Sequence, residues 1–112
     1  MKITDKELEI QLAIKKVKEN PFALKHVSPE LKNNKDVVLV AVEKHCEALK
    51  YASEELQNNI EVVLTAVRQD GDALEYASEE LKNNLKVVRV AVEENPAAFK
   101  FASKKTALKL KE

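Results

Sequence analysis

The sequence predicts an all-α protein, a short α-solenoid of about three 25-residue helical repeats with N- and C-terminal capping helices. Three observations predict this fold class. A 25-residue pattern begins at Ala23, Ala48 and Ala73, and a fourth copy starts at Ala98 and then diverges. Residues that cap helices recur at the same place in each copy. Glycine occurs once and proline three times, so long stretches are free to be helical. A fixed period of this length indicates small units that stack on their neighbours.

The repeat divides a single domain, residues 1–112, into five parts. We expect an N-terminal cap over 1–22, repeats over 23–47, 48–72 and 73–97, and a partial C-terminal repeat over 98–112. A chain of 112 residues is the size of one ordinary domain. The pattern leaves the handedness of the stack open.

The first and last parts differ from the repeats, as the terminal units of a stack do. Thr4 to Glu7 is typical of a capping box, which predicts a helix that continues to about Glu19. Lys15 and Lys16 stand where the next copy has apolar residues, so one face of this helix is expected to meet water. The last part is basic and is expected to be a solvated end; its lysines are Lys104, Lys105, Lys109 and Lys111.

One repeat can be read as a series of helical segments. In the second copy Asn59 is a helix cap, and it predicts a long helix over about 60–69. Gly71 is expected to end that helix in the left-handed conformation. A short helix follows over about 72–76, and Ser78 caps one more turn that begins with paired glutamates. The sequence leaves open whether that last turn is separate from the short helix.

The predicted long helices are apolar on several faces. Residues 37–42 read VVLVAV and residues 62–67 read VVLTAV. A helix that is apolar all round is buried between neighbours, which is what a stack requires. The β-branched valines are also compatible with a strand, but the repeated caps and the near absence of glycine favour a helix.

Composition and charge exclude several classes of protein. Lysine and arginine number 19 and so do aspartate and glutamate, so we expect no direct binding to nucleic acid by bulk attraction. No apolar run approaches the roughly 20 residues that span a bilayer, and the N-terminus is not a signal peptide. Cys46 is the only cysteine, which favours a reducing compartment. We expect the cytoplasm, or the host-cell cytosol if the protein is an exported effector.

Comparison of the copies assigns the histidine at position 26 to the scaffold. A position filled alike in every copy is needed by the fold, whereas a position that differs is free to serve a partner. His26 occupies the position of Tyr51, Tyr76 and Phe101, so an aromatic packing role is expected for it.

The remaining candidates for chemistry are also interpreted as structural. The run His45-Cys46-Glu47 lies at a junction between units, and adjacent residues at a helix end seldom point at one reacting atom. Two pairs of acids, Glu54-Glu55 and Glu79-Glu80, follow a capping serine, where they complement the helix dipole. We therefore expect no enzyme activity and no catalytic, cofactor-binding or metal-ligating residues.

The positions that vary between copies predict the function. They point to a non-enzymatic protein-interaction module that binds a macromolecular partner through exposed repeat-variable residues. Arg89 stands where earlier copies have leucine, and it is expected to be wet because no complete unit follows it. The candidate partner-binding residues are Glu43, Lys44, Arg68, Gln69, Arg89, Glu93 and Glu94.

Two alternatives remain open at the level of sequence. One is a small effector- or phage-type inhibitor of a larger enzyme or nucleoprotein complex, whose binding would depend on salt. The other concerns oligomerisation: Leu110 shares its repeat position with Ile60 and Leu85, and a poorly covered C-terminal end would allow a homodimer there.

The phrase ALKYASEELQNNIEVVLTAV and its echoes resemble domain-of-unknown-function family 4116, whose pattern is roughly A-L-x-Y-A-S-x-E-L-K-x-D-x-x-V-V-L-x-A-V. The resemblance covers Ala23 to about Ala97. Asn34, Asn59 and Asn84 stand where the family often has aspartate, and both residue types cap helices. The resemblance implies a tandem helical array. It implies no activity and transfers no functional residue, because the family has none assigned.

Overall fold

Twelve helical segments and no strand make up residues 2–110, which the computed structural model describes. The expectation of an all-α protein is confirmed. The long helices are α1 (Asp5–Glu19), α3 (Lys35–Lys44), α5 (Ile60–Gln69) and α7 (Leu85–Glu94). A 3₁₀ helix follows each of them: η1 (Pro21–His26), η2 (Cys46–Tyr51), η3 (Gly71–Tyr76) and η4 (Pro96–Phe101). A short helix comes next in each case: α2 (Pro29–Lys32), α4 (Glu54–Gln57), α6 (Glu79–Lys82) and α8 (Lys104–Leu110).

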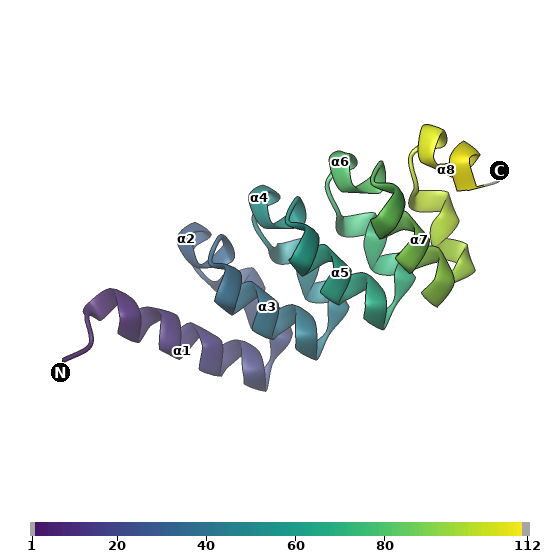
Figure 1. Ribbon diagram of the computed structural model, residues 1–112. Coiled ribbons are helices and arrows are strands. Elements are labelled where there is room, and N and C mark those ends of the chain that lie inside the picture. Colours follow the sequence, from purple (N-terminus) through teal and green to yellow (C-terminus); the bar gives the residue numbers. More distant parts are fainter. Residues whose placement is uncertain (1, 111–112) are drawn as a thin grey trace.

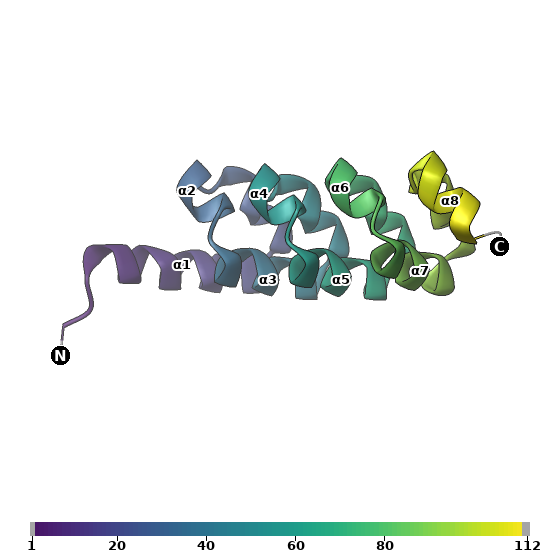
Figure 2. The same ribbon diagram turned by 45° about the horizontal axis from the view of Figure 1, so that its top comes forward.

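The segments are arranged in rows. The long helices lie side by side, so that α3 contacts both α1 and α5, and α5 contacts α7 (Figure 1). The 3₁₀ helices form a second row in which each contacts the next. The short helices lie along the margin opposite the long helices (Figure 2). Together these rows give a molecule 57 Å long and only 23 by 21 Å across.

The 25-residue period of the sequence reappears in the structure. The 3₁₀ helices begin at Pro21, Cys46, Gly71 and Pro96, which are 25 residues apart. The expected helix over 60–69 has those bounds, and the turn after the capping serine is a separate short helix. Local capping explains these boundaries, because the caps recur with the same period.

Side-chain caps begin every repeated helix. The Oδ1 atoms of Asn34, Asn59 and Asn84 accept a hydrogen bond of 3.1 Å from the backbone N–H three residues on. Ser53 and Ser78 cap α4 and α6 in the same way, at 3.2 and 3.1 Å. Each such cap stabilises its helix by about 1 kcal/mol. The capping residues therefore fix where each short helix begins, although such short helices would not form alone.

Gly71 does not adopt the left-handed conformation expected of it. No residue of the described chain has a positive φ, and Asp70, the C-cap that follows α5, has extended backbone with φ −155°. Gly71 instead begins η3, at a point where a Cβ atom would lie 1.9 Å from the backbone oxygen of Ala91. Glycine is required here because η3 approaches the backbone of α7 in the next unit.

We call one long helix, together with the 3₁₀ helix and the short helix that follow it, a unit. The same pair of hydrogen bonds links each unit to the next. The Ser78 backbone N–H donates to the Gln57 carbonyl at 2.9 Å, and the Ser78 hydroxyl donates to Asn58 Oδ1 at 2.5 Å. Ser53 and Ser103 make the equivalent bonds to the units before them. The capping serine therefore has two roles, one within its own unit and one between units.

The core runs along the middle of the stack. Leu24, Leu49 and Leu74 are fully buried, one in each of the first three 3₁₀ helices, η1, η2 and η3. The valine pairs near the start of α3, α5 and α7 are also fully buried. In α8 Thr106 replaces the buried leucine of the earlier short helices, and its hydroxyl donates to Asn83 Oδ1 at 2.9 Å. The diverged fourth copy thus keeps its contact with the third.

Candidate functional site

The seven predicted partner-binding residues are all exposed. Six of them occupy the last two positions of α3, α5 and α7, whose C-terminal ends lie along one edge of the row (Figure 1). We call these six the helix-end edge: Glu43, Lys44, Arg68, Gln69, Glu93 and Glu94. Arg89 lies about one turn before this edge on α7. The structure therefore brings residues from three repeats together on one surface, although their role in binding stays a prediction.

The charges of the helix-end edge change along the stack. Lys44 and Arg68 place a cation in the last turn of α3 and α5, where the helix dipole is negative. The last turn of α7 has no basic residue and carries Glu93 and Glu94 instead. No ion pair recorded in residues 2–110 includes either glutamate. Two anions at the negative end of a helix oppose its stability, so the fold does not account for them.

The side chain of Gln69 is held by hydrogen bonds within the fold. Its side-chain amide donates to the Val42 carbonyl at 2.6 Å and to the Glu43 carbonyl at 3.2 Å. These are carbonyls from the last turn of α3, which have no partner within that helix. Gln69 therefore links α5 to α3. Its side chain is less available for contact with a partner than the side chains of the other five residues of the edge.

Arg89 occupies a position that is partly buried in α3, as Leu39, and buried in α5, as Leu64, and a complete unit follows both of these helices. The equivalent Leu64 is 7% exposed, because α7 packs beside α5. Arg89 is exposed, and the segments that follow it are η4 and α8, without a fifth long helix among the described residues. This agrees with the expectation that Arg89 is wet because the stack ends there.

The junction at His45 is a cap. His45 Nδ1 accepts a hydrogen bond of 3.2 Å from the Glu47 backbone N–H, and this cap begins η2. Asn20, Asp70 and Asn95 occupy the same position before the other 3₁₀ helices and make the same bond. The His45 ring also lies 4.9 Å from the Phe22 ring, measured between centroids. The sequence indicates caps at Asn20 and Asn95, but at His45 it indicates only a turn.

A polar cavity of about 220 Å³ lies beside the junction, between His45 and Tyr76. Cys46 borders it but is buried, and burial raises the pKa of its thiol, with the Asp70 and Glu47 carboxylates adding to the effect. A raised pKa keeps the thiol protonated, which is the opposite of what a nucleophile needs. Within residues 2–110 no group of three His, Cys, Asp or Glu side chains could hold a metal ion. The geometry offers no activated group at this cavity.

The paired glutamates lie at helix starts, as the sequence predicted. Glu54-Glu55 and Glu79-Glu80 lie in the first turn of α4 and α6, at the positive end of each helix dipole. Glu80 also accepts a hydrogen bond of 3.0 Å from the Asn58 side-chain amide in the unit before it. These carboxylates stabilise helix starts and a contact between units.

The expectation for His26 needs correction. Tyr51, Tyr76 and Phe101 are half-buried, but His26 at the equivalent position is exposed. The reason is its place in the row: η2, η3 and η4 each contact the 3₁₀ helix before them, whereas the described residues include no 3₁₀ helix before η1. His26 therefore lines an open groove instead of filling an aromatic packing position.

That groove is the feature that comparison of the copies did not identify. It lies between α1 and the segments η1 and α2 and has a volume of about 280 Å³. A signal was present: the position that is valine in the three later long helices is also apolar in α1, as Leu12. The groove is lined by Glu9, Leu12, Ala13, Lys16, Ala23, His26, Val27 and Leu31.

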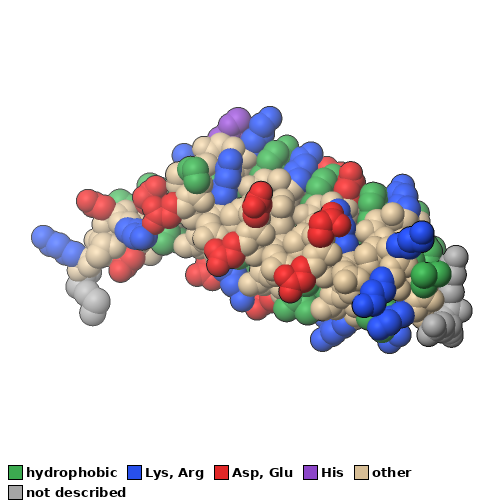
Figure 3. Space-filling model, turned by 90° about the horizontal axis from the view of Figure 1, so that it is seen from above, with side chains coloured by type: hydrophobic (Ala, Val, Ile, Leu, Met, Phe, Trp, Pro, Cys, Tyr) green, Lys and Arg blue, Asp and Glu red, His purple; other side chains and the backbone are tan. Residues whose placement is uncertain are grey.

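Basic side chains gather at the C-terminal end, whereas acidic and basic side chains are mixed over the rest of the same face (Figure 3). The exposed lysines of α8 are Lys104, Lys105 and Lys109; the predicted Lys111 lies outside the described residues. In the part of the chain that the structure describes, no helix has the length and apolar character needed to cross a bilayer.

Comparison with known proteins identifies one family. The family described as "Domain of unknown function (DUF4116)" matches twice in tandem, over residues 9–57 and 59–106. The two matches extend beyond the resemblance seen in the repeats, into α1 at one end and α8 at the other. No curated protein and no solved structure matches the chain. Because the two matches cover most of its length, the chain belongs to the DUF4116 family.

Proposed function

We propose that this chain is a short α-solenoid that acts as a non-enzymatic protein-interaction module and binds its partner along the helix-end edge. The long helices recur every 25 residues and lie side by side, which supports the solenoid (Figures 1 and 2). Stacked units of this kind present extended surfaces that suit macromolecular partners. The balanced charge of the chain and its free, buried Cys46 support a protein partner in a reducing compartment such as the cytoplasm.

The observation that carries the proposal is the end of α7. Glu93 and Glu94 are exposed, have no ion pair among the described residues, and lie where the helix dipole disfavours them. At the same two positions α3 has Glu43 and Lys44 and α5 has Arg68 and Gln69, so each of these helix ends includes a cation and the acidic pair is no requirement of the repeat. Charged residues that oppose helix stability are retained most simply because a partner contacts them.

The proposal is tested by reversing these charges. In Glu93→Lys/Glu94→Lys, both new lysines lie at the negative end of the α7 dipole, so the free energy of unfolding should rise by about 0.3–1 kcal/mol for each. Affinity for the partner should nevertheless fall roughly tenfold or more, because the contact loses its charge complementarity. Loss of binding by a more stable protein cannot be attributed to unfolding. Thermal unfolding gives the stability, and titration calorimetry gives the affinity.

The matched control is Lys86→Glu, a charge reversal at the other end of α7. Lys86 is exposed and has no recorded ion pair. The partner itself is first captured in cells with a photo-reactive residue in place of Lys44, and a second sample carries it in place of Lys86. A partner that cross-links from Lys86 but not from Lys44, or that binds the double variant as tightly as the wild type, would place the binding surface elsewhere.

The same titrations separate a protein partner from a nucleoprotein target. Binding to a target that contains nucleic acid should weaken steeply as salt rises, whereas contacts between protein side chains weaken less. The effector- or phage-type inhibitor is favoured only if salt dependence is steep and the captured partner is an enzyme or nucleoprotein complex.

A further inference from the structure

The outer face of α1 is uncovered, although its repeat positions are covered everywhere else. Val37, Val62 and Val87 are 0% exposed, but Leu12 at the same position is 52% exposed. Leu8, one turn earlier on this face, is 44% exposed. Each of α3, α5 and α7 contacts the long helix before it, whereas the described residues contain no unit before α1. The contact that builds the stack is therefore left incomplete at this end.

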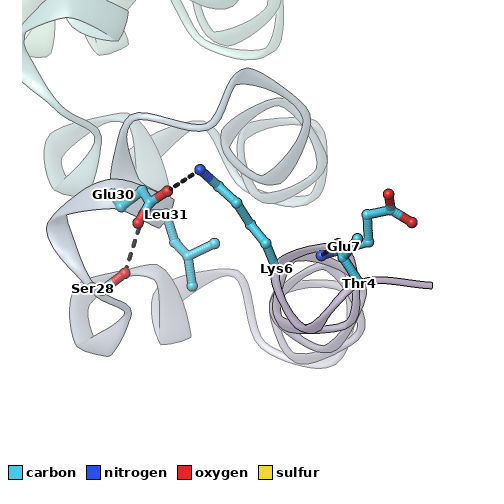
Figure 4. Close-up of polar contacts among 6 residues, drawn as sticks. All are labelled: Thr4, Lys6, Glu7, Ser28, Glu30 and Leu31. Carbon is cyan, nitrogen blue, oxygen red and sulfur yellow. Dashed lines mark hydrogen bonds and ion pairs between the residues drawn. The ribbon is translucent and has the colours of Figure 1, made fainter.

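The links between units also stop here. Ser53, Ser78 and Ser103 each donate their backbone N–H to a carbonyl of the preceding unit, and within residues 2–110 no such bond is recorded for Ser28. Glu30 corresponds to Glu80, whose carboxylate accepts an amide from the unit before it. In the first unit Glu30 pairs instead with Lys6 of α1 at 2.7 Å, next to Leu31 (Figure 4). This ion pair bridges α1 and α2 beside the groove and leaves the groove itself open.

The charges of α1 are mainly acidic in its first half and mainly basic in its second half, with Lys6 and Glu19 as the exceptions. Asp5 and Glu7 lie in its first turn, and Lys16 and Lys18 lie in its last turn. Glu9 and Lys16 both border the groove. A second α1 packed antiparallel would place the acidic half of each helix against the basic half of the other. A parallel arrangement would instead place like charges together.

We propose that two copies of this chain pair through the outer faces of α1, antiparallel and about a twofold axis near Leu12. Leu12 and Leu8 of each copy enter the groove region of the other, and Glu9 faces the partner's Lys16. The second α1 then covers the face that a preceding unit covers in the later units, although it runs in the opposite direction to a preceding long helix. A contact of this kind is isologous and closes at two copies.

The C-terminal end is a weaker site for a twofold contact. Leu108 is 57% exposed there, but it is surrounded by the lysines of α8, and that helix has no acidic residue between Lys104 and Leu110. A twofold axis at this end would bring lysines against lysines, which opposes association. The N-terminal face combines exposed leucines with charges that complement themselves.

Light scattering coupled to size-exclusion chromatography tests the proposal over a roughly hundredfold range of concentration, since a dimer dissociates on dilution. The full chain should run as a dimer. Leu12→Lys should raise the dimer dissociation constant about tenfold or more, because a charge replaces a central apolar contact. The control is Leu108→Lys, which should leave the dimer unchanged. Both leucines are exposed, so both variants should keep the wild-type circular dichroism spectrum and melting temperature at a concentration where the protein is monomeric.

A charge exchange tests the antiparallel arrangement itself. Glu9→Lys and Lys16→Glu should each weaken the dimer, and Glu9→Lys combined with Lys16→Glu should restore it, because every pair is then reversed together. A wild type that stays monomeric throughout the range would overturn the proposal. So would a dimer that Leu108→Lys disrupts and Leu12→Lys does not. Open chains longer than two copies, lost in both variants, would show a head-to-tail contact instead.

Discussion

An interior unit and the first unit use the same repeat positions under different conditions. The unit around α5 has a neighbour on both sides, and Val62 on the face toward α3 is fully buried. The unit around α1 has a neighbour on one side only, and Leu12 at the same position is half exposed. The difference shows that burial in this molecule depends on the number of neighbouring units more than on the residue at a position.

The largest expected effect comes from removing interior side chains. Leu74→Ala should lower the free energy of unfolding by about 2–5 kcal/mol, since Leu74 is fully buried and its loss leaves a cavity. Leu12→Ala should change the stability of the monomer by less than about 0.5 kcal/mol, because the side chain is already in contact with water. Urea unfolding at low protein concentration measures both. Equal losses in the two variants would mean that the first unit is covered in solution.

The contact between η3 and α7 can be broken by a single methyl group. In Gly71→Ala the new Cβ would meet the Ala91 carbonyl oxygen, so η3 and α7 must move apart, at a cost of about 1–3 kcal/mol. The control is Cys46→Ala at the same repeat position, where a Cβ is already accommodated, and its smaller cost should reflect only the lost sulfur. Thermal unfolding compares the two. An unchanged Gly71→Ala protein would show that the approach of these segments is looser than described.

Substitution of the capping serines measures the contribution of the hydrogen bonds between units. Ser78→Ala removes a helix cap and the hydroxyl that donates to Asn58, whereas Ser28→Ala removes only a cap. The loss of stability should therefore be larger for Ser78→Ala by about 1 kcal/mol, the net value of one hydrogen bond. Denaturant titration gives the difference. If both substitutions lower the free energy of unfolding equally, the hydroxyl hydrogen bond between units contributes nothing measurable to stability.

The smallest expected effect is a dependence on acid at the Asp70 junction. The Asp72 backbone N–H and then the Asn95 side-chain amide donate to Asp70, and both lower the pKa of its carboxyl below 3.8. A lowered folded-state pKa adds stability that is complete above the unfolded value and is lost as the pH falls through the folded value. Asp70→Asn keeps a capping oxygen, as Asn20 and Asn95 show, but does not titrate. Its stability should fall less than that of the wild type as the pH is lowered below about 4; parallel losses would contradict this assignment.

Much of the fold could be predicted because its signals are local. Asn59 marks the start of α5 through a bond to a backbone group three residues away, so its effect needs no distant partner. The position of the paired glutamates at helix starts and the exposure of Arg89 could be predicted for similar reasons. The sequence also showed that the copies vary at the helix ends, and the structure places those ends along one edge.

The rest depends on contacts between units that no single copy contains. Gly71 is glycine because of a carbonyl in the next unit, and nothing in its own neighbourhood indicates this. His26 matches an aromatic position but lacks the preceding 3₁₀ helix that would cover it. The exposure of the α1 leucines could not be predicted for the same reason. An apolar residue at a core position is expected to be buried unless the unit that would cover it is absent.

The serine links between units have a further consequence for motion. Because the serine links recorded within residues 2–110 join each unit to its direct neighbour, local opening does not require the whole chain to open. The terminal units, held from one side, should fray first. Amide hydrogen exchange should therefore be slowest around α5 and become faster toward both ends, so that protection follows position along the 57 Å axis.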